Sequence, residues 1–262
     1  MANIVKFEPK KWRQYYSIDL VEGALAQLDF LAVIDSNKVF QSVKTIRNAT
    51  YRYEKFWLPL AAKYHDKCLA APLDIEWVWH CHMLCPPIYE KDCMDICKTH
   101  VNHKLYSSTE RQKRVKESEK LWSKEYPGEP FYTDFSSDDR YGTDASQVSY
   151  DILSSSERQA VFYYQVSLPH YKDKRFLKEA ALRYRKYLYL KKLNPKEFLV
   201  PCYDIDLIWH THQLNPQAYK ADTERLLGRV LNHDDTVNDR SPNSKLIRAD
   251  SRTRELWYCY IQ

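Results

Sequence analysis

The sequence predicts an all-α protein made of two pseudo-symmetric helical repeats packed as one globular unit. Glycine accounts for only 4 of 262 residues, whereas tight hairpins depend on glycine for positive φ. Apolar residues recur at helical spacing in several segments. A long string of residues also recurs at a constant offset of 130 positions, which indicates an internal duplication.

The repeat centres on DIEWVWHCHMLCPPIYEKD at 74–92 and DIDLIWHTHQLNPQAYKAD at 204–222. It continues to an Asn-His pair at 102–103 and 232–233, and upstream, with one residue of slip, to Arg-Tyr pairs at 52–53 and 183–184. We therefore divide the chain into a first helical repeat at 1–126, a connector at 127–150 and a second repeat at 151–262 that includes a polar C-terminal tail. The connector is rich in Pro, Gly, Ser and Asp and shows no periodicity.

In the first repeat, Ser17 is expected to cap a helix that runs to about Ile34. Residues 38–66 carry further helix with a kink at Pro59. A capping box, Ser107-x-x-Glu110, opens a helix to about residue 124.

In the second repeat, Ser154-x-x-Glu157 is expected to open the first helix, and 172–193 forms a long basic helix. Residues 234–255 are polar and irregular in pattern, and 257–261 is expected to be a short strand or a packing tail.

Both repeated motifs are expected on helices. Asp74 and Asp204 follow a Pro-containing turn and are plausible N-caps, and Pro86 and Pro216 end these helices or open the next ones. At about 100° per residue, the two histidines of each H-x-H point roughly 160° apart, so one helix cannot chelate a metal with both.

The first histidine of each pair has a carboxylate four residues before it, the spacing at which side chains meet on a helix. Such a carboxylate fixes the imidazole tautomer and raises its basicity. The second histidine lies among Ile and Trp and is expected to project into the interface between halves. The structural alternative is a buried polar network that joins helices, because a histidine on an apolar face is usually satisfied by a hydrogen bond in the core.

The residues expected at the site fall into three groups. The acid–base candidates are His80, His82, His210, His212, Glu76 and Asp206. The metal ligands are His82 and His212, one from each half, around zinc or iron. The aromatic residues expected to contact a bound molecule are Trp79, Tyr89, Trp209 and Tyr219.

Two other patterns have weaker functional interpretations. Four cysteines, at 81, 85, 93 and 97, surround the first H-x-H, but the second repeat has Thr, Asn, Thr and Leu at these places. We therefore favour isolated thiols over a zinc knot. The basic segment 172–192 is either a contact surface for RNA or phosphate or, as we favour, a solvated helix face.

Composition restricts the protein class. Hydrophobic residues make up 44% and charged residues 29% of the chain, and the net charge is +5, as in an ordinary globular protein. No apolar run reaches the roughly 20 residues of a membrane span, and no secretory leader is visible. We expect a cytoplasmic protein with reduced thiols and no membrane partner; a small molecule is the expected ligand, and the oligomeric state stays open.

The motifs also resemble a known family. The segments VPCYDIDLIWHTHQLNPQAY at 200–219, LGRVLNHDDTVNDR at 227–240 and PLDIEWVWHCHMLCPPIYEKDC at 72–93 closely resemble the glycine-rich-domain-containing proteins of plants. The resemblance implies a domain without an established catalytic residue and an association with growth, auxin and stress responses. Plant members carry a Gly-rich tail and an RNA-related segment; this sequence shows no such tail, so an RNA function is not carried over.

Two functions follow from these observations. The first is a ligand-binding or metal-binding protein, or an enzyme of rearrangement, cyclisation or hydrolysis, with its His/carboxylate site between the repeats. The second is a helical scaffold or adaptor in growth or stress signalling, in which the histidines are structural and the basic helix contacts partners.

Overall fold

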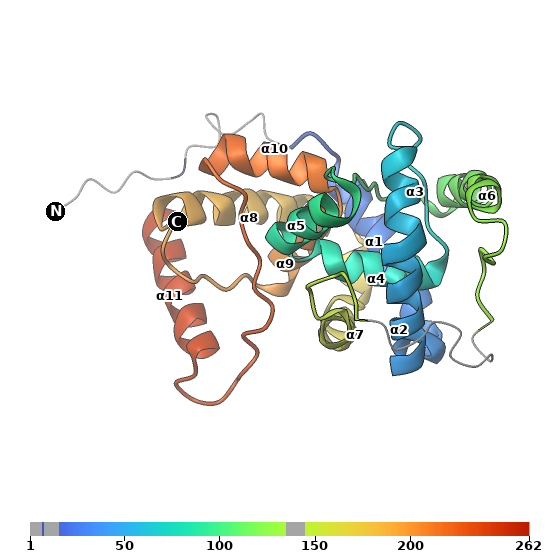
Figure 1. Ribbon diagram of the computed structural model, residues 1–262. Coiled ribbons are helices and arrows are strands. Elements are labelled where there is room, and N and C mark those ends of the chain that lie inside the picture. Colours follow the sequence, from blue (N-terminus) through green and yellow to red (C-terminus); the bar gives the residue numbers. More distant parts are fainter. Residues whose placement is uncertain (1–6, 8–15, 135–144, 262) are drawn as a thin grey trace.

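The computed structural model describes residues 7, 16–134 and 145–261, and over these residues the chain is helical without a strand (Figure 1). The predicted all-α fold is confirmed. The predicted connector 127–150 falls partly outside the described residues. The α-helices, in chain order, are α1 (Leu20–Ser36), α2 (Val43–Arg52), α3 (Leu58–Lys63), α4 (Leu73–Met83), α5 (Pro86–Cys97), α6 (Ser108–Glu125), α7 (Ile152–Val166), α8 (Lys174–Leu193), α9 (Tyr203–Gln213), α10 (Pro216–Leu227) and α11 (Lys245–Tyr260).

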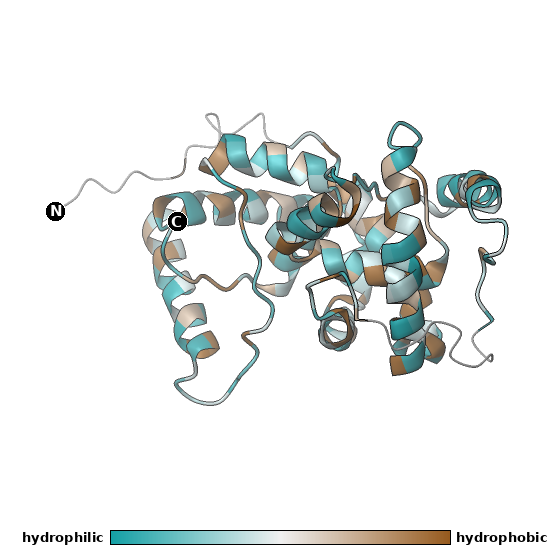
Figure 2. Cartoon of the chain, viewed as in Figure 1, coloured by the Kyte–Doolittle hydropathy of each residue, from teal (hydrophilic) through white to brown (hydrophobic). Residues whose placement is uncertain are grey.

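The helices pack around two hydrophobic cores. One core contains Trp57, Trp79 and Trp122, and the other contains Tyr184, Tyr187 and Trp209. Each helix in Figure 2 carries both brown and teal segments, as expected of amphipathic helices that bury one face. Among the described residues, no helix has both the length and the apolar composition that a membrane span requires.

Helices α1 and α7 bind the two cores together. The N-terminal part of α1 belongs to the second core through Leu20 and Leu28, while Leu31 belongs to the first core. Helix α7 is divided in the opposite sense, with Ile152 in the first core and Phe162 in the second. Each of these helices therefore spans the boundary between the repeats, and neither core is made from one repeat alone.

The close approach of α1 to α9 depends on a glycine. A Cβ atom on Gly23 would lie 2.7 Å from Cγ2 of Thr211, closer than packed atoms tolerate. The missing side chain lets the backbone of α1 lie directly on α9.

Several helix ends differ from the sequence prediction. The carboxylate of Asp19, not the hydroxyl of Ser17, caps α1, and Asp151 rather than Ser154 caps α7. Ser17 instead donates to Asp222 in the second repeat. Aspartate and serine cap equally well, so the sequence alone could not show that Asp19 caps the helix and that Ser17 has a distant partner.

The ends of α4 and α9 also differ. Asp74 and Asp204 lie inside the first turn, and the capping positions are Pro72 and Cys202, which provide no side-chain cap. The predicted starts at Pro86 and Pro216 are confirmed, as is the Ser107 cap of α6.

The segment around Pro59 and the C-terminal segment were also assigned from the sequence. Pro59 lies in the first turn of α3, directly after a π-helical turn at Tyr53–Trp57, and the predicted kink at this proline stays a prediction. The strand suggested for 257–261 is wrong, because residues 245–260 form α11 with Ser244 as its cap. The apolar residues of this segment are few and widely spaced, so the sequence pattern does not indicate a helix there.

Candidate functional site

Helices α4 and α9, which carry the two motifs, are anchored by ion pairs in their first turns. Asp74 pairs with the fully buried Arg52 at the end of α2, and Asp204 pairs with Arg183 of α8. Arg52 also donates to the backbone carbonyl of Phe131 at 2.6 Å. These contacts fix the direction of each helix relative to its neighbour and so determine where the histidines lie.

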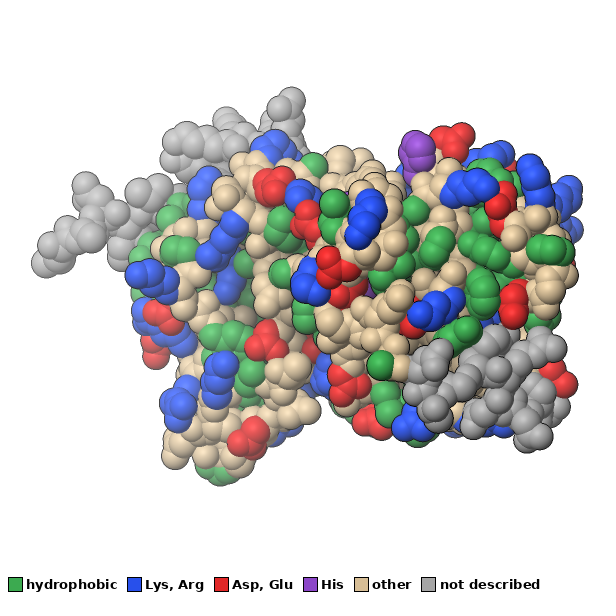
Figure 3. Space-filling model, in the orientation of Figure 1, with side chains coloured by type: hydrophobic (Ala, Val, Ile, Leu, Met, Phe, Trp, Pro, Cys, Tyr) green, Lys and Arg blue, Asp and Glu red, His purple; other side chains and the backbone are tan. Residues whose placement is uncertain are grey.

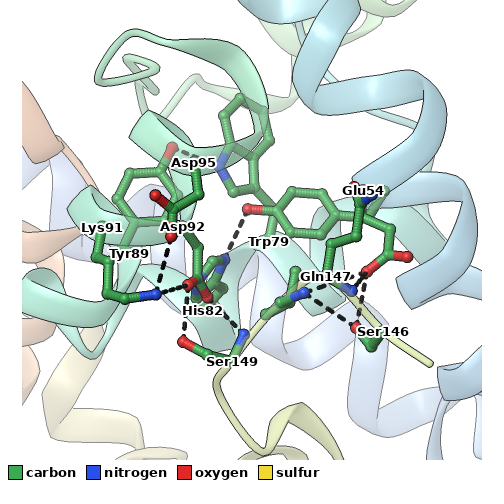
Figure 4. A network of polar contacts seen from close by, with 12 residues as sticks. Glu54, Trp79, His82, Tyr89, Lys91, Asp92, Asp95, Ser146, Gln147 and Ser149 are labelled. Atoms are coloured by element: carbon green, nitrogen blue, oxygen red, sulfur yellow. Dashed lines mark hydrogen bonds and ion pairs between the residues drawn. The ribbon is translucent and has the colours of Figure 1, made fainter.

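The second histidine of each motif lies between a tyrosine and an aspartate of the same core. In the first repeat, His82 Nδ1 lies 3.0 Å from the Tyr53 hydroxyl, and its Nε2 lies 3.2 Å from Asp92 Oδ2, a contact poorly aligned for a hydrogen bond. Figure 4 shows His82 among Trp79, Tyr89 and Asp92. His82 is fully buried, so both ring nitrogens face groups of the protein interior.

The second repeat reproduces this arrangement. His212 Nδ1 lies 3.1 Å from the Tyr184 hydroxyl, and its Nε2 lies 3.3 Å from Asp222 Oδ2. Burial raises the pKa of Asp222, but hydrogen bonds from His212, Arg225 and Ser17 outweigh it and bring the pKa to about 2. An ionised aspartate therefore faces a buried imidazole whose own pKa is lowered by burial.

Both networks are completed by serines that lie just before α1 and α7, the two helices that span the boundary between the repeats. Ser149, just before α7, donates its backbone N–H and its hydroxyl to Asp92, each at 2.7 Å. Ser17, just before α1, makes the same two contacts with Asp222. Each histidine thus lies between a tyrosine and an aspartate of its own core, and the structure does not bring His82 and His212 together around one metal as we expected.

The aromatic residues that we expected to contact a ligand are also paired internally. Trp79 donates from Nε1 to the Tyr89 hydroxyl at 2.9 Å, and Tyr89 donates to the carbonyl of Val101. Trp209 and Tyr219 make the equivalent chain. All four side chains are buried, and the polar atoms with which they could hold a ligand are used to fix the loop that follows each motif.

The first histidine of the second motif belongs to a compact cluster. His210 Nε2 lies 3.6 Å from Asp206 Oδ1 and 3.4 Å from His233 Nε2, and His233 Nε2 lies 3.0 Å from the same Asp206 oxygen. Within the described part of the chain, these residues are the one group of three His, Cys, Asp or Glu side chains close enough to hold a metal. The predicted contact between Asp206 and His210 is present, and His233 joins it from the segment after α10.

The dimensions of this triangle suit a transition metal. Ligand atoms about 2.1 Å from a tetrahedral metal lie about 3.4 Å apart, which matches sides of 3.0, 3.4 and 3.6 Å. Burial lowers the pKa of His210 to about 4 although Asp206 opposes it. Burial also lowers the pKa of His233, but Asp206 and the neighbouring carboxylates outweigh burial and raise it above its ordinary value, so a metal would have to displace a proton from His233. Neutral imidazole and ionised carboxylate are the forms that bind a metal.

The first repeat has the same three positions but not the same cluster. Glu76 extends past His80: its Oε1 lies 2.7 Å from His103 Nε2, and its Oε2 accepts the backbone N–H of Ala71. His80 Nε2 is buried without a hydrogen-bond partner among the described residues, and its ring packs against Phe30. The predicted contact between Glu76 and His80 is replaced by the pair Glu76–His103.

A cavity of about 550 Å³ adjoins these first-repeat residues and is lined by Glu76, His80 and His103 together with side chains of α1 and the start of α6. Burial and the nearby charge of His210 lower the pKa of His80 to about 3. The imidazole of His80 is therefore neutral at physiological pH.

The two repeats meet near the C-terminal ends of α4 and α9. Gln213 donates to the carbonyl of Leu84, and His103 contacts the carbonyl of Leu214. Glu90 and Lys220, which are equivalent in the two repeats, form an ion pair across the same boundary. His210 lies close enough to His80 to influence its pKa, whereas His82 and His212 each contact a tyrosine and an aspartate of their own core.

Other sequence features occupy ordinary positions. The four cysteines at 81, 85, 93 and 97 are free thiols, and burial raises the pKa of Cys81 and Cys93. On α8, Lys174 pairs with Glu22 and Lys191 with a backbone carbonyl. Basic and acidic side chains are interspersed on the face shown in Figure 3.

Sequence reasoning did not assign His103 and His233 to the site. Both belong to the repeated Asn-His pair, and their retention in both halves is the signal that the sequence offers. The loop that returns each of them to its motif lies more than 20 residues beyond the first histidine, so spacing alone could not reveal the contact.

Comparison with known proteins identifies relatives over most of the chain. The family model described as "Glycine-rich domain-containing protein-like" matches residues 3–92 and 88–222. Glycine-rich domain-containing protein 1 of Arabidopsis thaliana is 41% identical over 260 residues, and protein 2 of the same plant is 40% identical over 255. Each alignment covers 92% of this chain.

The matched region is a minor part of those relatives. The chain spans 31% of the length of the first and 32% of the second. No solved structure matches the chain. On the family-model match and these identities, the chain belongs to the glycine-rich domain-containing protein-like family.

Proposed function

We propose that this chain binds a divalent transition metal through Asp206, His210 and His233. The observation that carries the proposal is the triangle of one carboxylate oxygen and two Nε2 atoms with sides of 3.0–3.6 Å. The two imidazole nitrogens of His210 and His233, 3.4 Å apart, form a poor hydrogen bond on their own. A cation bound by both rings and by Asp206 would make the contacts of His210 with His233 and with Asp206 favourable.

The ligand set favours zinc or iron(II). Two histidines and one carboxylate bind zinc in catalytic sites and iron(II) in the facial triad of oxygenases, and both arrangements keep coordination positions open. The Asp206 side chain is 18% exposed, so water or a small molecule has access to this side of the cluster. A metal here would act as a Lewis acid or lower the pKa of a bound water, which supports metal-assisted hydrolysis or rearrangement of a small molecule.

Metal analysis of protein purified without a His tag tests the proposal. Wild-type protein is incubated with zinc, or with iron(II) under anaerobic conditions, dialysed, and analysed for bound metal by mass spectrometry. We expect a single ion per chain and a lower midpoint of thermal unfolding after chelation. Asp206→Asn and His233→Gln should weaken binding by more than the roughly 10–100-fold that loss of an outer-shell partner costs.

The first repeat provides matched controls. Glu76→Gln and His103→Gln change the equivalent positions in a half that lacks the triangle, so both should retain the metal. Absence of bound ion in the wild type, together with an unfolding midpoint indifferent to chelator, would remove the proposal. An equal loss of bound metal in all four variants would instead show that the substitutions destabilise the fold in general.

The cavity beside Glu76, His80 and His103 is the candidate place for an organic ligand in the first repeat. Its volume of about 550 Å³ falls within the range of small-molecule sites, and His80 presents a neutral imidazole there. We place His82 and His212 outside the reactive site and assign them a structural role, because each is fully buried between a tyrosine and an aspartate of its own core.

The second candidate function is a scaffold. The observation in its favour is that most polar residues of the motifs form closed internal networks, which hold helices together without a ligand. A protein with intact folding, no bound metal and no small-molecule ligand would support this function. A cytoplasmic location remains part of the proposal.

A further inference from the structure

Each imidazole of the candidate metal cluster has one nitrogen that the cluster does not use. His210 and His233 face the triangle with Nε2, and the Nδ1 atoms of both rings are buried without a hydrogen-bond partner among the described residues. A neutral imidazole that binds a metal through Nε2 carries its proton on Nδ1. In metal sites this N–H almost always donates to a carboxylate, a carbonyl or water. The cluster therefore needs an acceptor that the triangle itself does not supply.

Asp235, two residues after His233, provides an acceptor. Its Oδ1 lies 3.0 Å from Nη2 of Arg158 in α7, whereas its Oδ2 is buried without a partner among the described residues. Burial lowers the pKa of His210 and of His233, and the charge of Asp235 is among those that oppose burial at both rings. The carboxylate therefore lies within electrostatic range of both imidazoles.

Helix α7 links Asp235 to His210. Arg158 and Phe162 are four residues apart on α7 and so share one face of the helix. Phe162 packs against His210 with the ring centroids 4.4 Å apart, while Arg158 holds Asp235. Arg158 also donates to the Tyr150 hydroxyl at 3.2 Å, which fixes the guanidinium. One face of α7 thus contacts both the imidazole and the carboxylate.

The first repeat lacks this ion pair as well as the triangle. Asp235 corresponds to Leu105 at the repeat offset of 130. Arg158 corresponds to Ala26 of α1, in the register that also aligns the aspartate caps of α7 and α1. Leu105 and Ala26 both line the cavity beside His80. The ion pair thus accompanies the metal-type cluster and is not part of the framework that the repeats share.

We propose that Asp235 is a positioning residue of the metal site, whose Oδ2 accepts the Nδ1–H of His210 and holds the ring with Nε2 toward the metal. Arg158 keeps Oδ1 and so fixes the orientation of the carboxylate. The hydrogen bond selects the tautomer of His210 that binds a metal and makes Nε2 a stronger ligand. The inference rests on the metal proposed above, but it concerns a residue outside the triangle.

The zinc affinity of the intact chain, measured by competition with a chromophoric chelator, tests the proposal. Asp235→Asn should weaken zinc binding by about 10–100-fold. The single oxygen of asparagine is used by Arg158, and the amide group turned toward His210 is a donor. Asp234→Asn is the matched control, because this carboxylate is exposed, adjacent in sequence and also within electrostatic range of His233. It should change the affinity by no more than about fivefold, the effect of one screened charge.

A spectroscopic measurement on the wild type keeps the test valid if Asp235→Asn fails to fold. In the zinc-loaded wild type, the Nδ1–H proton of His210 should resonate at low field and exchange slowly with water. It is identified by through-bond correlations in protein labelled with ¹⁵N-histidine. Asp235→Asn should move this resonance to higher field, a change that a general loss of stability does not produce.

The outcomes separate this inference from the metal site itself. A wild type that binds no zinc removes both. Zinc affinity that Asp235→Asn leaves unchanged, or an equal loss in Asp234→Asn, overturns this inference alone. A Nδ1–H of His210 that exchanges freely with water in the zinc-loaded wild type does the same.

Discussion

The two repeats share a framework and differ at the positions that face cavities and the candidate metal. Each repeat has the Arg–Asp pair, the Tyr–His–Asp network and the Trp–Tyr–carbonyl chain. They differ where Glu76 replaces Asp206: the longer side chain reaches His103 and a backbone N–H, whereas the shorter one stays beside His210 and His233. The shared residues thus build the fold. The one methylene by which Glu76 exceeds Asp206 separates the Glu76–His103 pair from a cluster that could hold a metal.

The largest expected difference between the repeats concerns the Arg–Asp pairs. Arg52 is fully buried, whereas the side chain of Arg183 is 33% exposed. Arg52→Met leaves a buried carboxylate uncompensated and should lower the free energy of unfolding by about 3–5 kcal/mol. Arg183→Met should cost about 1 kcal/mol. Urea unfolding of both variants measures the difference; equal losses would show that burial does not distinguish the two pairs.

The Tyr–His–Asp networks should, in contrast, be equivalent. His82→Leu and His212→Leu each leave a buried tyrosine hydroxyl without its partner, so each should cost about 2–3 kcal/mol of unfolding free energy. Chemical denaturation checks this, with Tyr53→Phe/His82→Leu as the control that removes both partners. A loss in only one repeat would break the equivalence and reopen a functional role for that histidine.

The pH dependence of stability should separate His80 from exposed histidines. The unfolded chain protonates this residue below about pH 6.5, whereas the folded-state pKa of His80 is lowered by burial to about 3. The stability that neutral His80 contributes to the folded state is therefore complete above pH 6.5. It is lost as the pH falls from 6.5 toward 3, by about 1.4 kcal/mol of unfolding free energy per pH unit.

Denaturation of wild type and His80→Gln between pH 7 and pH 5 measures this slope. The variant should lose stability less steeply on acidification. His65→Gln, at an exposed histidine, is the control for the loss of an imidazole as such. Identical slopes in wild type and His80→Gln would contradict the assignment.

The smallest expected effect lies where the repeats touch. Glu90 and Lys220 are equivalent positions with opposite charge, and each is about one-third exposed. Glu90→Lys and Lys220→Glu place like charges together, and the double exchange restores the pair. The coupling energy from this cycle should be below about 1 kcal/mol; a value well above that would show that the contact between repeats depends on this ion pair.

The sequence by itself determined the helical class, the duplication and the helices that carry the motifs. These features depend on local periodicity, on the scarcity of glycine and on residue strings compared at one offset, and none of them requires knowledge of distant contacts. The contact of Asp206 with His210 could be predicted from their i,i+4 spacing, but the same spacing wrongly predicted a contact of Glu76 with His80, because the longer glutamate finds a distant partner.

Only the tertiary structure decided which residues meet across long separations. The return of His233 to His210, the reach of Glu76 to His103 instead of His80, and the exchange of α1 and α7 between the cores all depend on packing of segments far apart in the chain. Ser17 looked like a helix cap because local sequence favours that role, yet its partner is Asp222, 205 residues away. Local energies differ little between such alternatives, and burial of the cores selects among them.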